Sequence, residues 1–221
     1  LCTKVCPLQE NYTGSEAVPD IYALQNHQKD IVGKSSSGGM FSLLADWVLA
    51  QNGAIYGVAF DEGFQVRHMR ADSGEKAAAF RTSKYVQSNP ARIYEHICED
   101  LKNGVNHFLE MKHADTSRLY SCDNICHGVP SPGVWEDYLE ILRTRHMAPD
   151  TQITAINMRS KRLSWKKHTM DVETSAGSLE EVMKEFSFDD IYHSNYPGRP
   201  SCAHCHYTSF KRPADFTLGD F

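Results

Sequence analysis

The chain has 221 residues, with 23 Lys and Arg against 28 Asp and Glu, which gives a formal net charge of −5. Apolar residues make up 41% and charged residues 23%, the balance of a folded globular domain, which excludes a disordered chain. No basic stripe is present, so nucleic acid is not expected as a partner. The most apolar stretch, residues 40–50, is too short to span a membrane and contains Asp46.

Seven cysteines are present, and six of them form closely spaced pairs. The pairs are Cys2/Cys6, Cys122/Cys126 and Cys202/Cys205, and Cys98 stands apart. Residues 1–10 lack the charged start and apolar run of a secretory signal, so we expect a cytoplasmic protein. In that compartment paired cysteines favour metal binding over disulfides, and reduced structural thiols are the alternative.

The first half of the chain predicts a loop-rich start followed by a helix and a hairpin. Apolar residues at helical spacing predict a helix from Met40, which Asn52 and Gly53 end. Two alternating stretches, 54–60 and 64–70, flank the turn residues Asp-Glu-Gly and predict a β-hairpin. Two further helices are expected, at 74–80 and 91–104. On the second of them Cys98 lies beside an apolar face and is expected to be a core thiol.

The second half alternates strands and helices. Strands are expected at 105–110, 118–125, 151–159 and 166–174. Helices are expected from Pro132 onward and over 179–194, and the closing residues 216–221 resemble a strand. Because hairpins are frequent, the fold predicted is α/β with α+β character, a mixed β-sheet flanked by helices.

The first cysteine pair lies in the sequence CTKVCP. The Cys-x3-Cys-Pro order matches the end of a bacterial ferredoxin run, so Cys2 and Cys6 are candidate iron–sulfur ligands, although not necessarily of one cluster. The chain does not begin with Met and stops just after a strand-like stretch, so we expect a fragment of a longer protein. Residues 1–20 are predicted to be the remnant of a ferredoxin-type 4Fe-4S module, and residues 21–221 a separate domain.

Two later motifs also carry thiols. In DNICHGVPSP, Cys126 ends a predicted strand, and the glycine after His127 permits close backbone approach. His127 is a candidate proton donor or polar neighbour of a cofactor, and a surface histidine is the alternative. Cys202 and Cys205 are separated by two residues, a spacing that lets both sulfurs face one zinc ion or iron–sulfur cluster.

A run of small residues precedes the first predicted helix. In KSSSGGMF, hydroxyls, backbone N–H groups and the positive end of the helix dipole favour a phosphate, whereas ordinary capping is the alternative. The sequence RTSKYVQS adds Arg81, Lys84 and Tyr85, which suit phosphate binding or stacking on a ring. We expect a ligand-binding turn.

Four stretches together resemble the coenzyme F420 hydrogenase/dehydrogenase β-subunit family. They are SSSGGMFSLLADWVLAQNGAIYGVAF, RTSKYVQSN, LYSCDNICHGVPSP and RPSCAHCHYTSFKRPADFTLGDF, in the family's order. The resemblance covers residues 34–221, and CTKVCP resembles the ferredoxin module often fused ahead of this domain. It implies an iron–sulfur flavoprotein that contains FAD and a 4Fe-4S cluster and moves electrons between clusters and a hydride-accepting partner.

The resemblance also implies site residues. The cluster ligands would be Cys126, Cys202 and Cys205, and the flavin would lie near Ser36, Ser37, Gly38, Gly39, Ser83, Lys84 and Tyr85. The family's Gly-Thr-Pro-Cys-Gln loop is missing, so the fourth ligand is Cys122, His113 or none. Expected partners are a redox partner subunit or ferredoxin and a small-molecule hydride acceptor or donor. The sequence does not identify the electron acceptor, which could be F420, a ferredoxin, a nicotinamide or an unsaturated small molecule.

Two other readings stay open. A zinc-binding structural module would pair Cys2 and Cys6 with Cys202 and Cys205, and the serine-rich turn would then be only a helix cap. A degenerate family member would keep the fold, lack cofactors and act as a partner subunit.

Overall fold

The structure is a computed structural model, and it describes residues 19–90, 92–103, 107–108, 119–194, 197–209, 212 and 214–219. The predicted positions Cys2, Cys6 and His113 lie outside the described residues. The helices are α2 (Lys29–Gly33), α3 (Met40–Leu49), α4 (Gly74–Ala78), α5 (Ile93–Lys102), α6 (Pro132–His146), α7 (Glu180–Glu185) and α8 (Phe188–His193), with 3-10 helices η2 (Pro200–His204) and η3 (His206–Thr208).

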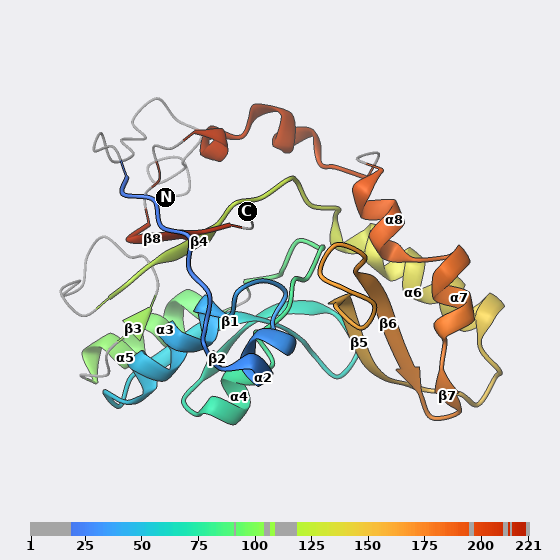
Figure 1. The fold of residues 1–221 in the computed structure, drawn as a ribbon. Coiled ribbons are helices and arrows are strands. Elements are labelled where there is room, and N and C mark those ends of the chain that lie inside the picture. The colour runs from blue at the N-terminus through green and yellow to red at the C-terminus, as the bar shows by residue number, and fades with distance from the viewer. Residues whose placement is uncertain are drawn as a thin grey trace.

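The strands form three small sheets. They are β1 (Ala54–Phe60), β2 (Val66–Ala71), β3 (His107–Phe108), β4 (Cys122–Asn124), β5 (Ile153–Ser160), β6 (Thr169–Thr174), β7 (Gly177–Ser178) and β8 (Phe216–Leu218). The order β2-β1-β3 is mixed, since β1 pairs antiparallel with β2 and parallel with β3. The pair β4-β8 is parallel, and β5-β6-β7 is antiparallel. The predicted α/β class with flanking helices is confirmed, but the strands are divided among three sheets (Figure 1).

The first core lies between α3 and the β1-β2 hairpin. Ala45 and Val48 of α3 pack on Ile55 and Ala71, as the predicted helix and hairpin require. The hairpin turn is held by the carboxylate of Asp61, which accepts hydrogen bonds from the backbone of the residues that follow it. This unit carries the serine-rich turn at the start of α3.

The second core is built on α6. Trp135, Tyr138, Leu139 and Leu142 are buried on one face of α6, where helical spacing predicts them, and they pack against the β5-β6 hairpin. Ser131 begins the helix, and its Oγ accepts a hydrogen bond from the backbone N–H of Val134 at 3.4 Å.

The two cores are joined through a tryptophan. The indole Nε1 of Trp135 donates to the backbone oxygen of Phe64 at 2.7 Å, which ties α6 to the β1-β2 turn. The Trp135 ring also stacks on Phe60 of β1, with ring centroids 5.9 Å apart. The α3 half and the α6 half of the molecule therefore form one continuous packed structure.

The helix expected over 179–194 is divided in two. The division falls at Phe186 and Ser187, and the Ser187 Oγ accepts a hydrogen bond from the backbone of Asp189 at 3.2 Å, which begins α8. This local cap outweighs the continuous helical pattern of the sequence. Phe188 in the new first turn is fully buried.

The helix α5 confirms one expectation and corrects another. Ile93, Ile97 and Leu101 are buried against Tyr56 as predicted, whereas Cys98 beside them is half-buried and not part of the core. In the part of the chain that the structure describes, no helix has the length and apolar character needed to cross a membrane.

Candidate functional site: a cysteine loop beside a basic pocket

The pairing of β4 with β8 positions the Cys126 loop. Cys122 lies opposite Phe216, and the backbone of Ile125 donates to Leu218 at 2.8 Å just beyond the strand pair. The chain then runs without regular structure to α6, and the segment with η2 and η3 passes alongside it (Figure 1). Two distant parts of the sequence therefore meet where both carry cysteines.

Gly128 lies at this meeting point, next to Cys202. Its φ of +107° lies in the region that favours glycine, and a Cβ atom there would lie 3.7 Å from the Sγ of Cys202. A Cβ at Gly128 would thus meet Cys202 at an ordinary van der Waals distance, and it is the positive φ that favours glycine here. The sequence predicted that this glycine permits close backbone approach, and the structure identifies Cys202 as the neighbour.

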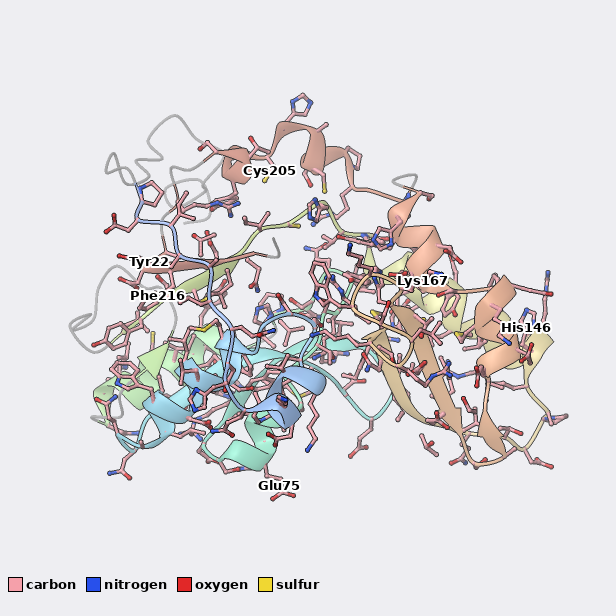
Figure 2. The ribbon with its side chains drawn as sticks, in the orientation of Figure 1. Tyr22, Glu75, His146, Lys167, Cys205 and Phe216 are labelled. Carbon is pink, nitrogen blue, oxygen red and sulfur yellow. The ribbon has the colours of Figure 1, made fainter. Side chains whose placement is uncertain are left out.

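The Cys126 sulfur has a backbone donor. The N–H of Gly128 donates to the Cys126 Sγ at 3.3 Å. Cys126 is exposed, and Cys202 and Cys205 are half-buried. All three are therefore accessible enough to act as metal ligands, and Figure 2 shows Cys205 on the outer edge of the molecule.

The η2 helix presents the second pair. Pro200 begins it, and the backbone of Cys202 donates to Arg199 at 2.9 Å. Cys205 follows the last residue of η2, and its carbonyl accepts from the Thr208 hydroxyl at 3.2 Å. The turn holds both cysteines on one short segment.

The three cysteines are not spaced for a single ion. A zinc ion with sulfur ligands at about 2.3 Å needs donors roughly 3.8 Å apart. Among the residues that the structure describes, no group of three metal-binding donors within 4.8 Å contains a cysteine. A four-iron cluster does not require this close spacing, because each cysteine then binds a different iron.

Cys122 lies in a different environment from these three. Its side chain packs with Tyr120 on the apolar cluster under α3, and burial, aided by the Asp123 carboxylate, raises the pKa of its thiol to about 12. A thiol in this environment is a poor ligand. Of the candidates for a fourth ligand, Cys122 therefore has no support from its position.

His127 lies beside Cys126 and is exposed to solvent. An exposed imidazole there can exchange protons with water and reach a molecule bound above the loop. The position fits both the predicted proton donor and an ordinary surface histidine.

The serine-rich turn meets the RTSKY segment directly. The Ser36 Oγ accepts from the backbone N–H of Ser83 at 2.7 Å and from its hydroxyl at 3.2 Å. Lys161, at the end of β5, donates from Nζ to the backbone oxygen of Ser37 at 2.7 Å and to that of Val32 at 3.2 Å. The two predicted flavin-side segments are thus joined, with a third segment that the sequence did not indicate.

The two glycines of this turn have a local packing role. A Cβ at Gly38 would lie 2.8 Å from the backbone oxygen of Leu24, and the backbone of Asn26 donates to Gly38 at 2.8 Å. Gly39 has a φ of +82° and caps α3. Backbone contact with the preceding segment therefore explains Gly38, and the left-handed φ explains Gly39.

Two other predicted residues are engaged within the protein. The Lys84 ammonium donates to the backbone oxygens of Ala79, Arg81 and Thr82, and burial lowers its pKa to about 8. The ring of Tyr85 stacks on Tyr192 of α8, with centroids 4.1 Å apart. Lys84 closes its own loop, whereas Tyr85 connects the loop to α8.

A basic pocket of about 320 Å³ opens beside the serine-rich turn. Its walls come from the end of α2, from the loop at Thr82 and from the end of β5. They are Gly33, Lys34, Ser35, Thr82, Asn157, Arg159, Ser160, Lys161 and Arg162. Four cations on one pocket attract an anion, although Arg162 also pairs with Glu180 at 3.0 Å.

The β5 side of this pocket was missed in the sequence. The sequence feature that marks it is the basic run RSKR, residues 159–162, which begins at the last residue of the predicted strand 151–159. Such a run after a strand is common on surfaces, so only the position of Lys34 and Thr82 opposite it reveals a pocket.

The loop that carries Thr82 and Tyr85, next to the basic pocket, is connected to the Cys126 loop through Tyr85 and its neighbours. Burial and the nearby Cys126 raise the pKa of Tyr192 to about 12, so the stacked tyrosine pair reaches the cysteine loop. The backbone of Gln87 also donates to Pro130 at 3.0 Å. The predicted flavin and cluster residues therefore occupy adjacent parts of one surface.

Comparison with known proteins gives little further information. No protein-family model and no curated protein matches the chain. One solved structure, a chain from the F420-reducing [NiFe] hydrogenase complex of Methanosarcina barkeri, is similar with a TM-score of 0.44 and 13% identity. The similarity covers 82% of this chain and 63% of that chain, so this chain spans less than two thirds of its neighbour. A similarity this distant does not establish a shared function.

Proposed function

We propose that the protein is an iron–sulfur flavoprotein that passes electrons between a 4Fe-4S cluster and FAD. The cluster would be held by Cys126, Cys202 and Cys205, and FAD would bind at the basic pocket and the adjoining serine-rich turn. The observation that carries the proposal is the packing of the Cys126 loop on Cys202 through Gly128.

The donor set fits a cluster. Thiolates are the usual ligands of four-iron clusters, and hydrogen bonds to their sulfurs tune the reduction potential. The N–H of Gly128 supplies such a bond to Cys126. Since Cys122 is directed into an apolar cluster, three cysteines would bind three irons and leave the fourth to another donor.

The pocket fits the phosphate end of a dinucleotide. Lys34, Arg159 and Lys161 supply positive charge, and the volume of about 320 Å³ accommodates a pyrophosphate, although it is smaller than FAD as a whole. The rest of the cofactor would extend over the surface between Tyr85 and the cysteine loop. Lys161 would also hold the serine-rich turn in place through its bonds to Val32 and Ser37.

The protein's own residues would bind and orient the groups. A bound flavin would accept or release a hydride and exchange single electrons with a cluster. His127 would exchange a proton with solvent at the cysteine loop, and the Tyr85-Tyr192 pair would hold the two halves of the site in contact. The external partner would be a redox subunit or ferredoxin, together with a small molecule that takes or gives a hydride.

The flavin part is tested by FAD binding to the purified protein. Replacing Arg159 or Lys34 with Ala should weaken binding at least about tenfold, because each removes a cation facing the phosphates. K167A is the matched control, since Lys167 is an exposed cation of the same β5-β6 loop but does not line the pocket (Figure 2). Equal FAD affinity in R159A, K34A and K167A would exclude the pocket as the site.

The cluster part is tested with single cysteine variants. C126S, C202S and C205S should each lose iron and sulfide after anaerobic reconstitution, whereas C98S on α5 should retain both. Full iron content in C202S would reject the ligand assignment. A colourless protein that binds zinc would instead favour a structural module.

A further inference from the structure

Three other metal-binding side chains meet outside the cysteine site. His168 precedes β6, and Asp189 and His193 lie four residues apart on the same face of α8. One ring nitrogen of each histidine and one carboxylate oxygen of Asp189 lie within 4.8 Å of one another. In the described part of the chain this is the group of three donors that meets the spacing of a metal site.

The individual distances suit one ion. The Nε2 of His168 lies 3.2 Å from Oδ2 of Asp189, and the Nδ1 of His193 lies 3.3 Å from Oδ1. A tetrahedral zinc ion with nitrogen and oxygen ligands at about 2.0–2.1 Å separates its donors by about 3.3 Å. Each histidine therefore lies at this spacing from one oxygen of the Asp189 carboxylate, and all three donors lie within 4.8 Å of one another.

The three side chains are buried on the Asp189 side of the group and open to solvent at His193. The side chain of Asp189 is 13% exposed and that of His168 20%, whereas His193 is 52% exposed. The Oδ1 atom of Asp189 is buried and has no hydrogen-bond partner among the residues that the structure describes, so a bound cation would satisfy it. The exposed side next to His193 leaves room for water as a further ligand.

One hydrogen bond competes with an ion. The Nδ1 of His193 also lies 2.8 Å from the backbone oxygen of Asp189, so without metal it can donate there. Ligation through Nδ1 requires its lone pair, so this hydrogen bond would break and the ring proton would move to Nε2. The cost is about one ordinary hydrogen bond, which is small beside the gain from a transition metal.

We propose that His168, Asp189 and His193 bind a divalent transition-metal ion of the zinc type, with an open coordination position. Two imidazoles and one carboxylate suit such ions, and three protein ligands with one open position are typical of catalytic rather than structural zinc. The ring of His193 lies 6.0 Å from that of Tyr85, so the ion would lie beside the tyrosine pair. The site is independent of the cysteines and of the proposed function.

The test uses zinc and cobalt binding with the cysteine donors removed. In a variant with Ser at positions 2, 6, 126, 202 and 205, isothermal titration should show one Zn²⁺ per chain. Co²⁺ should give a visible spectrum without thiolate bands. H168A, D189N and H193A should each weaken Zn²⁺ binding at least about tenfold, because each removes one of three ligands. H96A is the control, since His96 is exposed on α5.

Three results decide the proposal. H193A is the most informative variant, because its half-exposed side chain can be removed with little effect on the fold, which circular dichroism would check. No stoichiometric Zn²⁺ binding, or equal weakening by H96A, would overturn the proposal. In the chain with all cysteines, H193A should bind one Zn²⁺ fewer than the unmodified protein, and an unchanged stoichiometry there would also overturn it.

Discussion

Gly128 faces the side chain of Cys202, and a Cβ at Gly128 would lie 3.7 Å from the sulfur, an ordinary van der Waals contact. The contact brings the end of the β4 segment to the Cys-x2-Cys turn. The Gly128 N–H donates to the sulfur of Cys126. One glycine thus adjoins two of the three cysteines at the candidate cluster site.

Replacing Gly128 with Ala should disturb this arrangement. The φ of +107° strains any side chain, so G128A should lose about 1 kcal/mol or more in unfolding free energy and should retain less iron after reconstitution. Chemical denaturation and iron analysis measure the two effects. G133A is the control, since Gly133 lies in the first turn of α6 and has space for a Cβ. Equal iron retention in both variants would contradict the role of Gly128.

The cysteines should differ in reactivity. At pH 8 a thiol with a pKa of about 12 is ionised in only about one molecule in ten thousand, so Cys122 should resist iodoacetamide in the folded protein. Cys126 is exposed and should be alkylated first. Mass spectrometry after a short pulse locates the label, and unfolded protein should be labelled at both positions. Rapid labelling of Cys122 in the folded protein would restore it as a candidate ligand.

The contact between Ser36 and Ser83 should contribute to stability. S36A removes the acceptor of the Ser83 backbone N–H and should lower the unfolding free energy by about 1–2 kcal/mol. In S37A the backbone oxygen that accepts from Lys161 is kept, so a change within about 0.5 kcal/mol is expected. Urea denaturation of both variants is the measurement. A larger loss in S37A than in S36A would contradict this view of the turn.

A histidine in β2 should make stability depend on pH. Burial lowers the pKa of His68 from its ordinary 6.5, and its Nδ1 lies 2.9 Å from the Ser88 hydroxyl. The unfolded chain therefore takes up this proton at a higher pH than the folded protein. Stability is lost as pH falls from about 6.5 through the folded pKa.

The comparison with H68Q isolates this effect. The unfolding free energy of the unmodified protein minus that of H68Q should be constant above about pH 7 and should decrease toward pH 5. Denaturation at a series of pH values gives the difference, in which the other titrating groups largely cancel. A difference that stays constant or increases toward pH 5 would show that His68 is not buried in its neutral form.

Local patterns in the sequence predicted much of the fold. The helices α3 and α6 and the β1-β2 hairpin follow from spacing that can be read within one element. The break between α7 and α8 was missed because Ser187 resembles an ordinary helix residue until its side chain caps Asp189. The division into three sheets depends on contacts between distant segments, which spacing does not encode.

The candidate site was predictable only in part. A thiol pair and a flexible glycine were visible in the sequence, but the contact between Gly128 and Cys202 depends on the pairing of β4 with β8. The basic pocket needs Lys34 and Arg159 from opposite walls, and neither position is distinctive by itself. The positions of Cys2 and Cys6 lie outside the described residues, and their role stays a prediction.

The most direct test of the account is an anaerobic visible spectrum of the protein after iron–sulfide reconstitution with FAD, with bound iron, sulfide, zinc and flavin quantified. The account predicts flavin bands together with broad iron–sulfur absorbance, at least about four irons per chain, and loss of that absorbance in C202S. A colourless protein that holds zinc or no metal at Cys126, Cys202 and Cys205 would contradict it.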